Sequence, residues 1–154
     1  MTYGVPGDLS SQREDMPVAK IVVGVDGSAN SARAVRWCAE HAAALNAEVV
    51  AVHVIDLGAG VGVPIPPMPP EQRRELLHRV THDWCKPLAD AGVAFRGVLM
   101  DGRPALALRA AAGTEQAELV VTGRRGRGGF AKLLLGSTSH QLTHHLERPL
   151  VIVP

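Results

Sequence analysis

A glycine-rich segment late in the chain contains the residues best suited to hold a phosphate group. Gly123 and Gly126 are separated by two residues, and nine residues separate Gly126 from the pair Gly136 and Ser137. Glycine has no Cβ atom, so such a loop can take positive φ angles and lets an anion approach backbone N–H groups. Ser137 begins a predicted helix, whose first turn offers free N–H donors and the positive end of its dipole. Phosphate is the predicted guest, and a surface turn is the alternative for such a loop taken alone.

Two other nucleotide-binding motifs do not fit this segment. A P-loop requires Lys and then Ser or Thr directly after its last glycine, and no such sequence follows the glycines here. The dinucleotide fingerprint requires GxGxxG in register after a strand, and an acidic residue at the end of the following strand. Neither feature is present in the sequence. Both motifs are therefore excluded.

Histidine and serine residues are the other candidates for chemistry, as metal ligands or as catalytic groups. Two histidine pairs have the i, i+4 spacing of metal ligands on one helix face: His78 with His82, and His140 with His144. No Cys or acidic pair completes a ligand set, so surface histidines are favoured. His53 lies inside a predicted buried strand and is expected to be a hydrogen-bonded core histidine. Because Ser137 lacks the context of a nucleophile elbow, we predict no catalytic residue.

The elements that must position the glycine-rich segment follow from hydrophobic patterning. Buried strands are predicted at residues 21–25, 48–55, 94–100, 119–121 and 150–153. Helices are predicted from Ser28, over 70–91 with a kink or early stop at Pro87, over 104–113, and from Ser137 to before Pro149. Alternation of strands and helices is typical of a parallel α/β sheet with helical crossovers.

Length and composition limit the function classes. The chain has 154 residues, about the size of one domain, and no apolar run near the roughly 20 residues of a membrane-spanning helix. Residues 1–17 are expected to be a flexible leader without a signal sequence, and residues 18–154 one domain. Cys38 and Cys85 are not spaced as a redox or metal motif, so buried free thiols in a reducing cytoplasm are expected.

Nucleic acid is not an expected partner. The formal net charge is +1, and the chain has 2 Trp, 1 Tyr and 2 Phe, of which only Phe130 is near the glycine-rich segment. Readers of single strands need aromatic stacking platforms, which are missing here. Any anion site must therefore be local.

Further motifs flank the glycine-rich segment in a recognisable order. Residues 21–28 read IVVGVDGS, residues 52–56 read VHVID, residues 102–104 read GRP, and residues 148–153 read RPLVIV. Together with the Gly, two residues, Gly, nine residues, Gly-Ser spacing they cover residues 18–154, and they closely resemble the ATP-binding subgroup of the universal stress protein family. The resemblance implies a single-domain, doubly wound, five-stranded parallel sheet of order 3-2-1-4-5 with helices on both faces. This fold is Rossmann-like and similar to that of the adenine nucleotide alpha hydrolases.

The resemblance also implies a site at the point where strands 1 and 4 are neighbours. The implied nucleotide-binding residues are Gly24, Val25, Asp26, Val54, Gly123, Gly126, Gly136, Ser137 and Thr138. Asp26 is expected to meet a ribose hydroxyl or a phosphate-bound Mg²⁺, with capping of the following helix as the alternative. For Arg124, Arg125 and Arg127, screening of phosphate charge and solvation on the surface are both left open.

The implied function is that of a cytoplasmic, ATP-binding regulatory module of the stress response, with Mg²⁺ as a second cofactor. A homodimer through the apolar strand 150–153 is expected, and the long loop 57–69 is expected to act as a lid. A slow ATPase or phosphotransferase is one alternative. A binder of cyclic or monophosphate nucleotides on the same fold is another.

Overall fold

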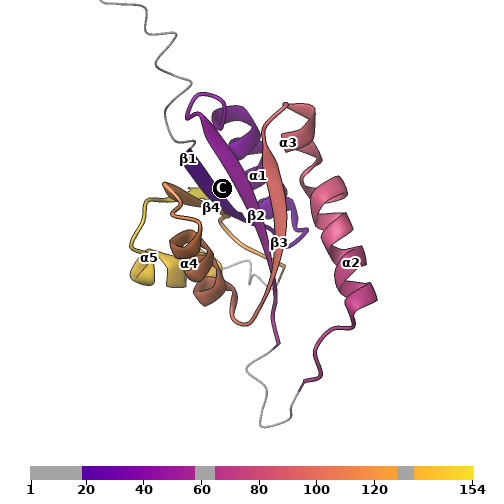
Figure 1. Ribbon diagram of the computed structural model, residues 1–154. Helices are drawn as coiled ribbons and strands as arrows, with labels where there is room; N and C mark the ends of the chain where they lie inside the picture. Colours follow the sequence, from indigo (N-terminus) through magenta and orange to yellow (C-terminus); the bar gives the residue numbers. More distant parts are fainter. Residues whose placement is uncertain (1–18, 58–64, 128–133) are drawn as a thin grey trace, which may run out of the picture.

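The structure, a computed structural model, describes residues 19–57, 65–127 and 134–154. Five strands form one parallel sheet (Figure 1). They are β1 (Ala19–Gly24), β2 (Ala47–Ile55), β3 (Phe95–Asp101), β4 (Leu119–Gly123) and β5 (Leu150–Val153). The strand order is β3-β2-β1-β4-β5, which confirms the predicted doubly wound topology. The expected leader, residues 1–17, and residues 58–64 of the expected lid lie outside the described residues.

The register places apolar residues of neighbouring strands side by side. Val23 of β1 pairs with Ala51 of β2 on one side and with Val121 of β4 on the other. All three residues are fully buried. Because both faces of these strands are covered, their sequences read as continuous apolar runs instead of alternating ones.

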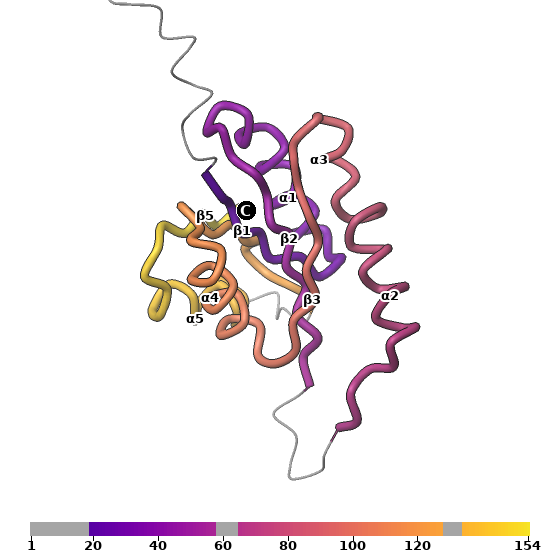
Figure 2. The backbone as a smooth tube through the Cα atoms, viewed as in Figure 1, coloured from indigo at the N-terminus to yellow at the C-terminus, as the bar shows by residue number. Residues whose placement is uncertain are grey.

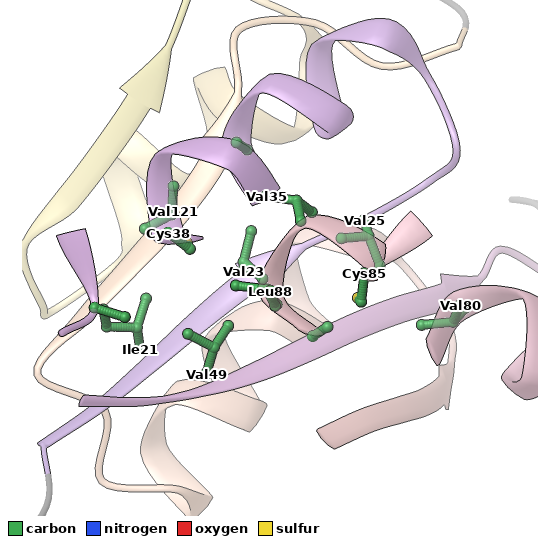
Figure 3. Close-up of a cluster of buried hydrophobic side chains, with 13 residues drawn as sticks. Ile21, Val23, Val25, Val35, Cys38, Val49, Val80, Cys85, Leu88 and Val121 are labelled. Atoms are coloured by element: carbon green, nitrogen blue, oxygen red, sulfur yellow. The ribbon is translucent and has the colours of Figure 1, made fainter. Parts of the chain in front are cut away.

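Helices cover both faces of the sheet (Figure 1). On one face lie α1 (Ala29–His41), the π-helical turn η1 (Val80–Trp84) and α3 (Lys86–Asp90), and on the other lie α4 (Pro104–Thr114) and α5 (Ser137–His145). The first core includes Val23, Val35 and Leu88 (Figure 3). The second includes Val22, Leu108 and Leu142. Neighbouring residues of β1 thus enter opposite cores, as the pleat of a strand requires.

The predicted helix 70–91 is broken into three parts. The α2 helix (Pro70–Arg79) runs beside the edge strand β3 and contains no buried residue (Figure 2). It continues into η1, and the chain then bends at Cys85, before Pro87 in the first turn of α3. Pro87 therefore marks a new helix start, where its missing N–H costs nothing. The π-helical turn between Val80 and Trp84 was not predicted.

The two cysteines are buried and free, as expected. Burial raises the pKa of the Cys38 thiol to about 12 and that of Cys85 to about 11. Thiols with raised pKa values are poor nucleophiles, so both act as small core residues. Among the described residues, no helix is long and apolar enough to cross a membrane.

An ion cluster holds the amino ends of the strands together. Lys20 of β1 lies 3.1 Å from Glu115, which follows α4, and Arg96 of β3 pairs with the same carboxylate. Arg96 also lies 3.7 Å from Glu48 of β2. The hydrogen bonds from Arg96 and then Lys20 hold the pKa of Glu115 below its usual range. The cluster therefore joins three strands and one helix at this end of the sheet.

Candidate functional site

A cavity of about 540 Å³ lies at the opposite, carboxyl ends of β1, β2 and β4. Here β1 leads into α1 on one face of the sheet and β4 leads toward α5 on the other, so the cavity is at the topological switch point. The nine residues predicted to bind a nucleotide all line it: Gly24, Val25, Asp26, Val54, Gly123, Gly126, Gly136, Ser137 and Thr138. Residues almost a hundred positions apart are thus brought into one wall.

Asp26 joins the turn after β1 to the loop after β4. Its Oδ1 accepts a hydrogen bond of 2.9 Å from the Ser28 N–H, and its Oδ2 accepts one of 3.2 Å from the Arg127 N–H. Ser28 itself caps α1, since its Oγ accepts the Ser31 N–H at 3.2 Å. The helix-entry role considered for Asp26 is thus present in the turn. The second bond places the same carboxylate against the predicted phosphate loop.

Gly126 faces the Asp26 carboxylate directly. A Cβ atom built on Gly126 would lie 2.6 Å from Asp26 Oδ2, so a side chain here must displace the carboxylate. The φ angle of Gly126 is not positive, so this residue does not use the left-handed backbone that glycine would allow, and space is the reason for glycine here. Gly27, in the turn after β1, does have a positive φ angle, of +75°.

Gly123 has a different environment, although it belongs to the same motif. A Cβ atom here would lie 2.6 Å from the backbone carbonyl carbon and oxygen of Asn30, in the first turn of α1. Backbone atoms cannot swing aside as a side chain can. Gly123 therefore allows α1 to pack closely against the end of β4.

The first turn of α5 supplies hydrogen-bond donors to the cavity wall. Gly136 is the N-cap and has no side chain to satisfy the N–H groups of the turn that begins at Ser137. The Gly136 N–H donates to the Arg124 carbonyl at 2.8 Å, which closes the loop onto the helix start. Ser139 Oγ donates to the Gly123 carbonyl at 2.8 Å and fastens α5 to β4. Sequence patterning gave no signal for Ser139.

Two arginines line the cavity beside these donors. Arg125 and Arg127 both contribute to the wall, whereas Arg124 does not. The Nε atoms of Arg124 and Arg125 are both buried without a hydrogen-bond partner within the described part of the chain, and of these two residues only Arg125 lines the cavity. A buried donor without a partner is costly, and an anion in the cavity would relieve that cost. The polar end of the cavity is therefore suited to negative charge.

The other end of the cavity is apolar, with Val54 and Leu108 from the core on the α4 face. Val25 also contributes to the lining, but its side chain is only 3% exposed and lies in the core on the opposite, α1 face. A Cβ atom on Gly24 would lie 3.0 Å from Leu108 Cδ1, so this glycine lets the leucine approach the strand. His53 lines this wall and is half-buried instead of lying in the core. Its Nδ1 donates to the Val25 carbonyl at 2.7 Å, so the expected hydrogen bond is present. The cavity can hold a ligand with an apolar part and an anionic part.

Trp84, which lies near the site, was also missed by sequence reasoning. The Trp84 ring, at the end of η1, lies edge-on to His53 with ring centroids 5.2 Å apart. The Arg127 guanidinium lies 5.9 Å from the Trp84 ring centroid. Trp84 does not itself line the cavity. A single tryptophan in a helical pattern is usually a core residue, so the sequence held no signal for these contacts.

The histidine pairs lie away from the cavity. The rings of His78 and His82 stack with centroids 4.1 Å apart, and those of His140 and His144 are 4.8 Å apart. All four side chains are exposed. Within residues 19–57, 65–127 and 134–154, no group of three or more His, Cys, Asp or Glu side chains is arranged to hold a metal ion.

Comparison with known proteins identifies relatives along most of the chain. The model of the universal stress protein family matches residues 17–154. A universal stress protein of Methanocaldococcus jannaschii is 30% identical over 141 residues, which cover 87% of this chain and 81% of the relative. A universal stress protein of Mycolicibacterium smegmatis is 34% identical over 141 residues, covering 86% of this chain but 47% of the relative. The chain therefore spans about half the length of that relative.

Solved structures agree with the sequence comparison. A universal stress protein in complex with cAMP is 26% identical, with a TM-score of 0.66, and the match covers 88% of this chain and 96% of that one. A universal stress protein from Archaeoglobus fulgidus in complex with dAMP has a TM-score of 0.69 over 90% of this chain and 100% of that one. At 20% identity this second match supports the fold alone.

Proposed function

Because the chain belongs to the universal stress protein family, we propose that it binds ATP with Mg²⁺ in the cavity at the carboxyl ends of β1 and β4. In this proposal it works in the cytoplasm as a regulatory module of the stress response, with at most weak ATP hydrolysis. The observation that carries the proposal is the cavity itself. One wall collects all nine residues that the sequence motifs assign to the nucleotide.

The two ends of the cavity match the two parts of a nucleotide. The apolar end, where the Val54 and Leu108 side chains lie, suits an adenine ring. The polar end combines the first turn of α5 with Arg125 and Arg127, and so suits phosphate groups. Gly126 lets the Asp26 carboxylate lie close to the backbone of the loop that would hold the phosphates.

Asp26 is the proposed contact for Mg²⁺. The ion prefers oxygen ligands and keeps several waters, and each carboxylate oxygen of Asp26 accepts a single described N–H bond, so lone pairs remain for an ion or its waters. When bound, the ion would neutralise part of the phosphate charge. Asp26 would then hold the ion beside the loop that carries the phosphates.

A cyclic or monophosphate nucleotide is the second candidate ligand. The observation that favours it is the structural neighbour in complex with cAMP, at 26% identity. Such a ligand has the same adenine ring but less phosphate charge. It would therefore use the apolar end equally and the arginines less.

The test is to identify the ligand and then measure its affinity. Mass spectrometry of nucleotide released from the denatured protein is expected to detect ATP, and calorimetric titration is expected to rank ATP with Mg²⁺ above AMP, cAMP and GTP. A preference for cAMP would select the second candidate. The absence of binding by every nucleotide at millimolar concentration would contradict both.

We also propose a homodimer through β5. This strand is at the edge of the sheet, and all four of its residues are partly exposed apolar side chains. The carbonyls of Pro149 and Val153 accept from β4, so the alternate residues Leu150 and Ile152 direct their backbone groups to the open edge. An open apolar edge is a template for pairing with a second chain.

Replacing Ile152 with proline tests this interface. Proline removes an N–H group that faces the open edge and leaves the bonds to β4 in place. We expect light scattering at micromolar concentration to give a dimer for the parent protein and a monomer for Ile152→Pro. A parent protein that is already monomeric at this concentration would contradict the proposal.

A further inference from the structure

Two arginine side chains contact the Trp84 ring, and only one of them lines the cavity. The guanidinium of Arg127 lies 5.9 Å from the ring centroid and that of Arg79 lies 5.7 Å from it. Arg127 lines the cavity, whereas Arg79 does not. Arginine within about 6 Å of an indole ring is attracted to the negative face of the ring. The same aromatic ring thus holds one cation at the site and one away from it.

The position of Arg127 is restrained from three directions. Its backbone N–H donates to Asp26 Oδ2 at 3.2 Å. Its guanidinium lies over the Trp84 ring, 5.9 Å from the centroid, and a Cβ atom on Gly27 would lie 2.8 Å from Arg127 Nη2 and 2.6 Å from Trp84 Cζ2. Gly27, Trp84 and Arg127 are therefore packed against one another. A long arginine side chain next to the surface would otherwise sample many rotamers.

The helical phase that aims Trp84 at this point comes from η1. In the turn Val80–Trp84 the Cys85 N–H donates to the Val80 carbonyl at 3.0 Å, five residues back instead of the four of an α-helix, which rotates the residues that follow. Val80 at its start is fully buried in the core of the α1 face. The turn is thus anchored at one end, and its other end presents the indole ring to His53 and Arg127. Turns of this kind occur frequently at functional sites.

We propose that Trp84 is a positioning residue that holds Arg127 at the phosphate end of the cavity and so sets a preference for ligands with more phosphate charge. This inference rests on the proposed nucleotide binding and adds a specificity determinant outside the cavity wall. Trp84 touches no ligand. It acts by keeping the Arg127 charge in place before the ligand arrives, so that less side-chain entropy is lost on binding.

Affinity measurements test the proposal with two variants, one that preserves an aromatic ring at position 84 and one that removes it. Trp84→Phe keeps an aromatic face, whereas Trp84→Met fills the site with a flexible apolar chain. Calorimetric titration is expected to show about a three- to tenfold loss of affinity for ATP in Trp84→Met, no change for adenosine, and recovery of most of the loss in Trp84→Phe. An equal loss for ATP and adenosine would overturn the proposal, because it would indicate a general packing role.

Arg79 provides the matched control. It contacts the same ring but does not line the cavity, so Arg79→Ala is expected to leave the affinity for ATP unchanged. Arg127→Ala is expected to reproduce the loss caused by Trp84→Met, and the double variant is expected to lose no more than either single one. Fully additive losses in the double variant would overturn the proposal.

Fluorescence gives a reading that does not require a change at Trp84. The sequence has 2 tryptophans, so Trp37→Phe leaves Trp84 as the only one. Adding ATP to this variant is expected to change the emission with the affinity found by calorimetry, while adenosine has no effect, and Arg127→Met is expected to abolish the change. The same change with adenosine, or its persistence without Arg127, would overturn the proposal. A parent protein that binds neither ATP nor adenosine would instead contradict the proposed function.

Discussion

The two ends of the sheet are held in different ways. At the amino ends of the strands, Lys20, Glu48, Arg96 and Glu115 form a cluster of ion pairs that joins three strands and one helix. At the carboxyl ends, glycines allow close approach of neighbouring groups, and these ends line a cavity of about 540 Å³. One end is filled with charged side chains that pair with each other. The other leaves donors and cations directed to a space that a ligand can fill.

This difference indicates how stability and binding are divided within one small domain. In a parallel sheet the amino ends of all strands lie at one end and their carboxyl ends at the other, so one strand can contribute residues to both regions. Substitutions at the amino ends should change mainly the free energy of unfolding. Substitutions at the carboxyl ends should change mainly the affinity for nucleotide, except where a residue there also packs against a helix.

Gly123 is the residue at the carboxyl ends whose substitution is expected to lower the free energy of unfolding most. In Gly123→Ala the new Cβ atom would lie 2.6 Å from the Asn30 carbonyl group, and the first turn of α1 must move to relieve the contact. We expect a loss of about 2–3 kcal/mol in the free energy of unfolding, measured by urea denaturation without nucleotide.

A matched glycine makes this prediction specific. Gly113 lies within α4, and a Cβ atom there would meet nothing within 4 Å. Gly113→Ala is expected to stabilise the protein by about 0.5–1 kcal/mol, because alanine favours the helix. If both variants change stability equally, the packing of α1 on Gly123 is not what requires a glycine.

At Gly126 a substitution should affect nucleotide affinity while leaving the fold largely intact. Gly126→Val places a side chain against the flexible end of Asp26, so the fold should lose at most about 1–2 kcal/mol. Affinity for ATP with Mg²⁺ should fall at least about tenfold, or about 1.4 kcal/mol, because the side chain displaces the Asp26 carboxylate, which is the proposed contact for Mg²⁺ beside the phosphate loop. Calorimetric titration and a thermal melt measure the two effects. Unchanged affinity in a folded variant would show that phosphate does not bind at this loop.

Glu115 tests the amino ends and has the smallest expected effect. Its pKa is lowered by the hydrogen bonds from Arg96 and Lys20, so its stabilising effect is present above the unfolded-state value of about 4.3. The effect is lost as the pH falls through the lower, folded-state pKa. Glu115→Gln should therefore destabilise the protein by about 1 kcal/mol or less near pH 7, because the pairs are partly solvated. The difference from the parent should shrink below about pH 4.

Glu147 provides the control for that measurement. It pairs with Arg109 at 2.9 Å, but its side chain is 83% exposed. Glu147→Gln should change the free energy of unfolding by less than about 0.5 kcal/mol at any pH. A pH dependence as large as that of Glu115→Gln would mean that burial within the cluster has no special role. Urea denaturation between pH 3 and pH 7 measures both variants.

Most of the fold could be predicted from the sequence because its strands are buried on both faces. Runs such as residues 21–25 and 150–153 are continuous and apolar, and each coincides with a strand to within two residues. The strand order came from the resemblance to a family and not from the runs themselves. The site depended on the same resemblance, because no local pattern connects Asp26 with Gly126.

The remaining features depend on packing that has no sequence signature. The hydrogen bond of the η1 turn spans one residue more than that of an α-helix, and the turn is held by the contacts of Val80 and Trp84. The motif also does not reveal why each glycine is needed. Gly123 faces a helix backbone and Gly126 faces a carboxylate, although both obey one spacing rule. The two roles can be told apart only from the residues that surround each glycine in the folded structure.

The strand order has a consequence for the protein during its synthesis. β1 is the central strand of the sheet and leaves the ribosome first among the five, yet its partner β4 lies about a hundred residues later. At roughly 5–20 residues per second, one edge of β1 waits about 5–20 s for that partner. During this interval β1, β2 and β3 can pair, but the apolar edge of β1 stays open to wrong partners. The cavity cannot exist until β4 closes that edge, so under the proposed function a nascent chain would gain no protection from a nucleotide at the stage when it is most exposed to aggregation.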